Sequence, residues 1–226
     1  MIHKTAIIDS KAKLSGNVSI GPYSLVGPNV EIGENTNIQS HVNITGNTKI
    51  GKKNEIYPFC SIGSPPQDLK YKGEKNSIII GDNNKIREYV NINPGTEHGG
   101  GITKIGNHNL FMVYCHIAHD CIVGDSCIFS NSSTLAGHVT IGNFVILAGM
   151  VAIHQYCTVG DYAFITGGSL VRKDVPPYVK AAREPLSYVG VNSVGLRRRG
   201  FSTKKIREIQ SIYRILYQKN YNKSQA

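Results

Sequence analysis

The chain has 226 residues, of which 40% are hydrophobic and 18% are charged, and its formal net charge is +10. This composition excludes a disordered chain, and the absence of a long apolar run excludes a membrane-spanning protein. The first ten residues lack the basic start and apolar stretch of a secretory signal, so a cytoplasmic location is expected.

An aliphatic residue or a phenylalanine recurs at every sixth position along most of the chain. The period runs from Ile2 to Ile62, resumes in phase from Ile80 to Ile92, and continues after a one-residue slip from Ile105 to Val171. A helix would need spacings of three and four. The period instead predicts an all-β fold, a parallel β-helix in which three hexads form each coil, with roughly nine coils in total.

Two further residue types follow the same period. Glycine often comes directly after the sixth-position residue, where we expect it to serve turns that need a positive φ. All five cysteines lie two residues before a sixth-position residue: Cys60, Cys115, Cys121, Cys127 and Cys157. A shared slot predicts small buried core residues. It disfavours a disulfide framework, a cysteine-rich zinc site and a cysteine nucleophile.

Two polar segments interrupt the period, residues 64–76 and 94–104. The three walls of such a β-helix form a triangular prism, and both segments are expected to leave this prism as loops. The loops either carry function or are insertions that the rigid prism tolerates without a functional role. The prism is expected to end near Val171. The prolines of the following DVPPYV segment have no N–H, so they cannot donate the hydrogen bonds that a strand inside a sheet makes to its neighbour. This gives a β-helical domain over residues 1–175.

Residues 176–226 are expected to form a mainly helical extension. Ser202 is a plausible helix cap, and the apolar face is expected to hold Ile206, Ile209, Ile212 or Tyr213, and Leu216. From Ser193 onward there are nine Lys and Arg residues and one acidic residue, so most of the net charge lies here. Such a basic tail indicates an acidic partner or a solvated helix face.

Histidines gather at one edge of the predicted prism. Residues 18 apart lie on adjacent coils, about 4.8 Å apart, which puts His119, Gly137 and Gln155 in one column. The column on one side of it holds Asp120, His138 and Tyr156, and the column on the other side holds His154. Three interpretations follow: general-base catalysis with the Gly137 N–H as an oxyanion donor, a metal site of the gamma-carbonic-anhydrase kind, or histidines that fill a subunit interface.

Several motifs narrow these interpretations. They are QDLKY (67–71), GGGITK (99–104), HIAHDC (116–121), TLAGHV (134–139), IHQY (153–156), DVPPYV (174–179) and RRGFS (198–202). With them the chain resembles the UDP-N-acetylglucosamine O-acyltransferases of lipid A synthesis. The resemblance implies a left-handed parallel β-helix with a short helical C-terminal appendage, and a homotrimer with sites between subunits.

The resemblance also implies the reaction. A 3-hydroxyacyl chain passes from the phosphopantetheine of acyl carrier protein to the 3-position of UDP-N-acetylglucosamine, with no further cofactor and no metal. His119 is then the general base, Asp120 tunes it, and Gly137 donates to the oxyanion. The positions implied to bind substrate are Asp68, Lys70, His116, His138, His154, Gln155, Asn192, Arg198 and Arg199. Small residues at Gly149 and Gly167 imply a groove open to a long acyl chain.

Two positions depart from the family pattern. Asn93 stands where many members carry His, and Val194 stands where many carry Glu. These positions relate to contacts with the sugar nucleotide, so they bear on the donor and acceptor geometry. Separately, a related N-acyltransferase that acts on a glucosamine amine stays open beside the O-acyltransferase, as does an acceptor that carries a 3-amino group. The basic tail suits acyl carrier protein better than nucleic acid, because no base-reading motif is present.

Overall fold

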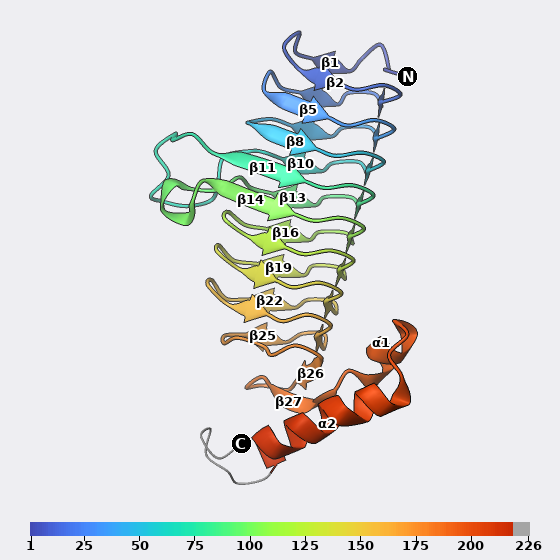
Figure 1. Ribbon diagram of the computed structural model, residues 1–226. Helices are drawn as coiled ribbons and strands as arrows, with labels where there is room; N and C mark the ends of the chain where they lie inside the picture. The colour runs from blue at the N-terminus through green and yellow to red at the C-terminus, as the bar shows by residue number, and fades with distance from the viewer. Residues whose placement is uncertain (219–226) are drawn as a thin grey trace.

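The structure is a computed structural model that describes residues 1–218, and it shows a tall prism with two loops on one side and two helices at its C-terminal end (Figure 1). Three parallel sheets form the walls. Sheet 1 has nine strands, which agrees with the predicted number of coils. The expected parallel β-helix is therefore confirmed.

Each coil contributes one short strand to each sheet. Sheet 1 contains β1 (Ile7–Ile8), β4 (Leu25–Val26), β7 (Asn43–Ile44), β10 (Ser61–Ile62), β13 (Asn91–Ile92), β16 (His116–Ile117), β19 (Thr134–Leu135), β22 (Ala152–Ile153) and β25 (Leu170–Val171). Sheet 2 contains β2 (Lys13–Leu14), β5 (Val30–Ile32), β8 (Thr48–Ile50), β11 (Ser77–Ile80), β14 (Ile102–Ile105), β17 (Ile122–Val123), β20 (Thr140–Ile141) and β23 (Thr158–Val159).

Sheet 3 closes the triangle. It contains β3 (Ser19–Ile20), β6 (Asn37–Ile38), β9 (Glu55–Ile56), β12 (Lys85–Ile86), β15 (Leu110–Phe111), β18 (Ile128–Phe129), β21 (Ile146–Leu147), β24 (Phe164–Ile165), β26 (Val179–Ala182) and β27 (Ser187–Val191). The edges of the prism are named here by the sheets they join: edge 1–2, edge 2–3 and edge 3–1. From β16 to β25, which come after both loops in the chain, paired residues in adjacent strands are 18 residues apart, as in the pair His116 and Thr134.

The predicted core is confirmed. From Ile20 to Val171 every sixth-position residue is buried, and the five cysteines are buried beside them. The same slot holds buried asparagines on sheet 3, where the Nδ2 of Asn84 donates to the Oδ1 of Asn54 at 3.1 Å. The prism is therefore filled by one column of large apolar side chains and one of small or hydrogen-bonded ones at each wall.

The expected role of the repeat glycines is wrong at all but one of their positions. Among the glycines that directly follow a sixth-position residue, only Gly63 has a positive φ. The left-handed position is instead the third residue after the sixth-position residue, and it is occupied by side chains such as Tyr23, His41 and Phe59. Glycine is required because coils approach closely: a Cβ at Gly33 would stand 2.6 Å from the carbonyl carbon of Gly51.

The prism continues beyond the expected end near Val171. Val175 forms a parallel bridge to Val159, and β26 pairs in parallel with β24. Pro176 and Pro177 fall between these two pairings, directly before Tyr178 with its left-handed φ of 64°. The prolines therefore lie at a corner, where no ladder donor is needed. The antiparallel strand β27 then ends sheet 3.

Two helices follow β27, α1 (Ser193–Arg198) and α2 (Thr203–Gln218). Figure 1 shows α2 lying across the end of the prism. The Ser202 Oγ accepts from the Lys205 N–H at 3.2 Å, which confirms the predicted cap. Ile206, Ile209 and Tyr213 are buried as expected, but Leu216 is 46% exposed, so its placement on the buried face was wrong. Within residues 1–218, neither helix is long and apolar enough to cross a membrane.

Candidate functional site

Both interruptions of the repeat leave the prism at edge 1–2, on neighbouring coils. Residues 64–76 connect β10 to β11, and residues 94–101, which contain the short helix η1 (Glu97–Gly99), connect β13 to β14. Figure 1 shows the two loops side by side. Where the first loop ends, the N–H of Ser77, the first residue of β11, donates to the Gly101 carbonyl at the end of the second loop at 2.8 Å. The first loop (residues 64–76) and the second loop (residues 94–101) thus form one wall beside the histidines of the following coils.

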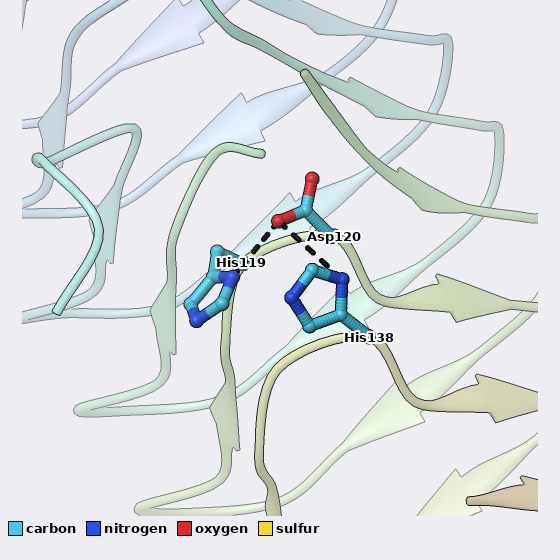
Figure 2. Close-up of side chains that lie close together, drawn as sticks. All are labelled: His119, Asp120 and His138. Carbon is cyan, nitrogen blue, oxygen red and sulfur yellow. Dashed lines mark hydrogen bonds and ion pairs between the residues drawn. The ribbon is translucent and has the colours of Figure 1, made fainter. Parts of the chain in front are cut away.

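His119 and Asp120 form the centre of the site, at the corner that follows β16 (Figure 2). The Nδ1 of His119 lies 2.8 Å from the Oδ2 of Asp120. An ionised carboxylate can only accept, so Nδ1 carries the hydrogen and Nε2 is left with its lone pair. This tautomer is the one in which an imidazole can take a proton from a substrate hydroxyl.

Asp120 is held by the second loop. Its side chain is only 1% exposed. Both carboxylate oxygens accept from the Thr96 N–H, at 2.9 and 3.0 Å, and Oδ2 also accepts from the Thr96 hydroxyl at 2.6 Å. The Asp120 N–H donates to the Thr103 hydroxyl at 2.9 Å. Sequence reasoning gave neither threonine a role: Thr96 lies in an aperiodic loop whose path cannot be read from a repeat, and Thr103, on β14, counted only as part of the GGGITK motif.

His138 lies one coil further on, as the column arrangement predicted. Its Nδ1 is 3.8 Å from the Oδ2 of Asp120, and its ring stacks on Tyr156 with centroids 4.5 Å apart. Burial lowers the pKa of His138, and the nearby Asp120 carboxylate partly opposes that shift. His138 is therefore held mainly as a neutral imidazole beside the His119–Asp120 pair.

Gly137 lies directly against the His119 ring. A Cβ at this position would stand 2.6 Å from Nε2 and 3.0 Å from Nδ1 of His119. The Gly137 carbonyl accepts from the Tyr156 N–H at 3.3 Å, while its own N–H has no hydrogen-bond partner among residues 1–218. Gly137 thus combines a free N–H with a surface on which the imidazole rests.

A cavity of about 420 Å³ lies between these residues and the first loop. Its lining comprises Gln67, Asp68, Leu69, Lys70, His98, His119, His138, Gln155 and Tyr156. Asn93 lies behind the lining: it is 1% exposed, and its Nδ2 donates to the Ser64 and Pro65 carbonyls at 3.2 and 3.3 Å. Asn93, which stands where many members of the family that this chain resembles carry His, therefore holds the start of the first loop in this chain.

The other predicted site residues lie away from the cavity lining. His116 is on β16 in sheet 1, and its pKa is lowered by burial and by the charge of His119. His154 is exposed, with Nδ1 3.2 Å from the Gln155 carbonyl. Gly149 and Gly167 follow strands β21 and β24 at edge 3–1, which is a different edge from that of His119.

The predicted residues of the tail are at edge 2–3. Asn192 caps α1 by accepting from the Gly195 N–H, and its Nδ2 donates to the Tyr162 carbonyl at 3.0 Å. Arg198 ends α1, and the guanidinium of Arg199 lies 4.9 Å from the centre of the Phe144 ring. One chain alone thus brings together Asp68, Lys70, His119, Asp120, Gly137, His138 and Gln155, but not the tail residues.

The cysteines are unsuited to nucleophilic chemistry. Burial raises the pKa of Cys60, Cys115, Cys121 and Cys127 to about 12. Their thiols donate to backbone carbonyls of the next coil, as from Cys127 to Gly142 at 3.0 Å. Because the thiolate is the reactive form, these residues are core packing, as their shared slot predicted.

The three residues of Figure 2 also have the atoms of a metal site. One ligand atom from each of His119, Asp120 and His138 lies within 4.8 Å of the others. However, the Oδ2 of Asp120 already accepts from the Thr96 N–H, the Thr96 hydroxyl and His119. A metal ion would have to displace these donors, so the arrangement suits a hydrogen-bonded general base better than a metal ion.

Two family profiles match this chain. Residues 174–226 match the family described as Udp N-acetylglucosamine O-acyltransferase, Domain 2. Residues 11–46 and 102–137 match the family described as Bacterial transferase hexapeptide (six repeats). The two matches cover the helical extension and parts of the prism, respectively.

Curated relatives and solved structures are similar over nearly the whole chain. Acyl-[acyl-carrier-protein]--UDP-N-acetylglucosamine O-acyltransferase of Aliarcobacter butzleri is 52% identical over 96% of this chain and 84% of its own length. The structure of LpxA from Acinetobacter baumannii is 48% identical with a TM-score of 0.96, covering 99% of this chain and 87% of that one. LpxA from Bacteroides fragilis, a UDP-N-acetylglucosamine acyltransferase, is 47% identical with a TM-score of 0.97, covering 99% and 88%.

Proposed function

This chain belongs to the family of UDP-N-acetylglucosamine O-acyltransferases, and from that premise we propose how its own residues carry out the reaction. The chain is an acyltransferase that takes its acyl group from acyl carrier protein and gives it to UDP-N-acetylglucosamine, the first step of lipid A synthesis. The proposed roles rest on the geometry of edge 1–2 for the reaction itself, and on edges 2–3 and 3–1 for the nucleotide and the acyl chain.

We propose direct transfer with His119 as the general base. Nε2 of His119 takes the proton of the sugar 3-hydroxyl as that oxygen attacks the thioester carbonyl of the acyl donor. Asp120 stabilises the imidazolium that forms, since it accepts from Nδ1 at 2.8 Å. The tetrahedral oxyanion is stabilised by the Gly137 N–H. When the intermediate collapses, the carbon–sulfur bond breaks and the leaving thiolate receives the proton from His119.

No acyl-enzyme is proposed for this reaction. The thiols of the prism are buried and protonated, so they offer no nucleophile. No metal or bound cofactor is assigned a role either, because the Oδ2 of Asp120 is fully used by protein donors. The acyl chain arrives on the phosphopantetheine of acyl carrier protein, and we place the reaction in the cytoplasm with that partner.

The acceptor is proposed to lie in the cavity beside His119. Asp68 and Lys70 of the first loop face this cavity together with His138 and Gln155. Lys70 supplies a cation suited to the pyrophosphate of a nucleotide sugar. His116 and His154, which lie outside the cavity lining, are proposed to contact the bound substrates beside it.

A homotrimer is proposed to complete the site. Asn192, Arg198 and Arg199 lie on edge 2–3, away from His119 of their own chain. In a trimer of parallel prisms, the tail of one subunit approaches the site of another, where Arg198 and Arg199 would meet phosphates of the nucleotide or of phosphopantetheine. The acyl chain would then run past Gly149 and Gly167 of the other prism, where small residues leave room for a long 3-hydroxyacyl chain.

The observation that carries this proposal is the contact between His119 Nδ1 and Asp120 Oδ2. The test replaces His119 by Gln and measures product by mass spectrometry with a panel of acyl carrier protein thioesters. We expect His119→Gln to lose turnover by on the order of 10³-fold while it stays folded. His3→Gln, at the exposed N-terminus, is the matched control. Turnover that survives in His119→Gln would contradict the general-base assignment.

The same assay separates the alternative acceptors. Each thioester is offered with UDP-N-acetylglucosamine and with its 3-amino analogue. Faster transfer to the amine would identify an N-acyltransferase at the same site. Zinc in the purified protein together with CO₂ hydration would instead support the gamma-carbonic-anhydrase interpretation.

A further inference from the structure

We propose that Thr96 of the second loop is a positioning residue for the general base, acting through Asp120. The inference rests on the proposed role of His119 and extends it to a residue that lies outside every motif described above. Thr96 supplies two donors to one carboxylate, its backbone N–H and its hydroxyl. Asp120 is in turn the hydrogen-bond partner of His119.

The contacts of Thr96 determine which way the carboxylate faces. The hydroxyl of Thr96 donates to Oδ2, the same oxygen that accepts from His119, at 2.6 Å. Its N–H bridges both oxygens at 2.9 and 3.0 Å. Counted over the whole residue, backbone included, Thr96 is 2% exposed and Asp120 is 6% exposed. Water therefore has little access to replace these donors, and the orientation of Asp120 depends on the loop.

The glycines of the loop support the same assignment. A Cβ at Gly99 would collide with the carboxylate of Asp120, and a Cβ at Gly95 would stand 2.6 Å from its Oδ1. Neither glycine has a positive φ, so the close approach, and not backbone conformation, is what favours glycine here. The loop is thus packed against Asp120 from Gly95 to Gly99.

The hydrogen bond of Thr96 has a definite electrostatic effect. Donors to a carboxylate spread its negative charge and stabilise its ionised form. Without the hydroxyl of Thr96, more of that charge would act on the imidazolium of His119 and favour its protonated form. This change moves the loss of general-base activity to higher pH. The other titratable groups that face this pair are His116, His138, Asp68, Lys70 and His98.

The test compares Thr96→Val, which removes the hydroxyl at nearly constant volume, with Thr96→Ser, which keeps it. We expect Thr96→Val to lower kcat about tenfold and to raise the acidic limb of the kcat/KM profile by roughly one pH unit. Thr96→Ser should stay within about twofold of the parent chain. Thr36→Val is the matched control, because Thr36 is also buried and its hydroxyl donates to the Gly51 carbonyl, away from the site.

A second readout does not depend on turnover. The ¹⁵N signals of His119, assigned by comparison with His119→Gln, should show its protonation midpoint at higher pH in Thr96→Val than in the parent chain. If Thr96→Val does not fold, Thr96→Ala gives the same comparison, since it also removes the hydroxyl but leaves more room.

The outcomes separate this inference from the proposed function. An unchanged acidic limb in folded Thr96→Val, or a loss in Thr96→Ser as large as in Thr96→Val, would overturn the role of the hydroxyl. Either result would leave the general base intact if His119→Gln is still inactive. Full activity of His119→Gln would instead remove the general base, and the role of Thr96 with it.

Discussion

The imidazole of His119 rests on the α-carbon of Gly137, one coil further along the prism, so closely that a Cβ there would stand 2.6 Å from Nε2. The two residues occupy the same position in successive coils, 18 residues apart. The glycine therefore sets the height of the base above the prism wall, in addition to leaving its N–H open.

Gly137→Ala should displace the base without unfolding the prism. The added Cβ pushes the His119 ring away, and a shift of about 1 Å at a catalytic group can lower kcat on the order of 10²-fold. Steady-state kinetics with a thermal melt checks this. Gly16→Ala is the matched control, because a Cβ at Gly16 meets nothing within 4 Å. Wild-type kcat in Gly137→Ala would show that the ring does not need this support.

Asn93→Ala should weaken the binding of the acceptor, UDP-N-acetylglucosamine, more than it slows the acyl transfer itself. The Asn93 amide holds the Ser64 and Pro65 carbonyls, where the loop that carries Asp68 and Lys70 begins. Loss of these hydrogen bonds should raise KM for the nucleotide sugar by roughly three- to tenfold. Asn91→Ala, which removes a contact to Ser61 within the prism, is the control. A lower kcat at constant KM would instead point to a role in the reaction itself.

Gly167→Met should shorten the preferred acyl chain. The new side chain would project at edge 3–1, where the open groove is proposed, while the Cβ itself lies 3.1 Å from the Gly149 carbonyl. A panel of acyl carrier protein thioesters of different lengths reports the preference, and Gly16→Met is the control for an added side chain. The assignment of the groove fails if the order of preference among chain lengths stays unchanged.

The protein should lose stability as the pH falls below about 6.5, partly through His116. Burial lowers the pKa of His116 from its ordinary value of 6.5 in the folded chain. Below that value the unfolded chain binds a proton that the folded chain does not, so protonation favours unfolding. Urea unfolding at several pH values should show a shallower acid loss in His116→Gln than in the exposed control His3→Gln. Equal slopes would contradict the prediction.

The arrangement of the histidines could be predicted from the sequence because the prism is periodic. Once a step of 18 residues is known, His138 must lie beside Asp120 and Tyr156 must lie beside His138, and the ring stack at 4.5 Å follows. The small buried slot of the cysteines could be predicted for the same reason.

Features outside the repeat could not be predicted in this way. The hydrogen bonds that Thr96 donates to Asp120 depend on the path of the connection between β13 and β14, which has no period. The reason for the repeat glycines depends on the distance between coils and not on a local turn, so a preference for positive φ was the wrong argument. The placement of Pro177 at a corner depends on a shift of the repeat after Val171 that the spacing alone does not reveal.

The position of both loops on adjacent coils separates the length of the prism from its chemistry. The strands β1 to β9 pair only with strands of adjacent coils, and none of their residues lines the cavity beside His119 and His138. Whole 18-residue units could be duplicated or deleted there, and the spacing of the catalytic groups would be unchanged. The coils from β1 to β9, about the first quarter of the chain, thus act as a base of adjustable length, and only the part from β10 onward must keep its exact count of coils.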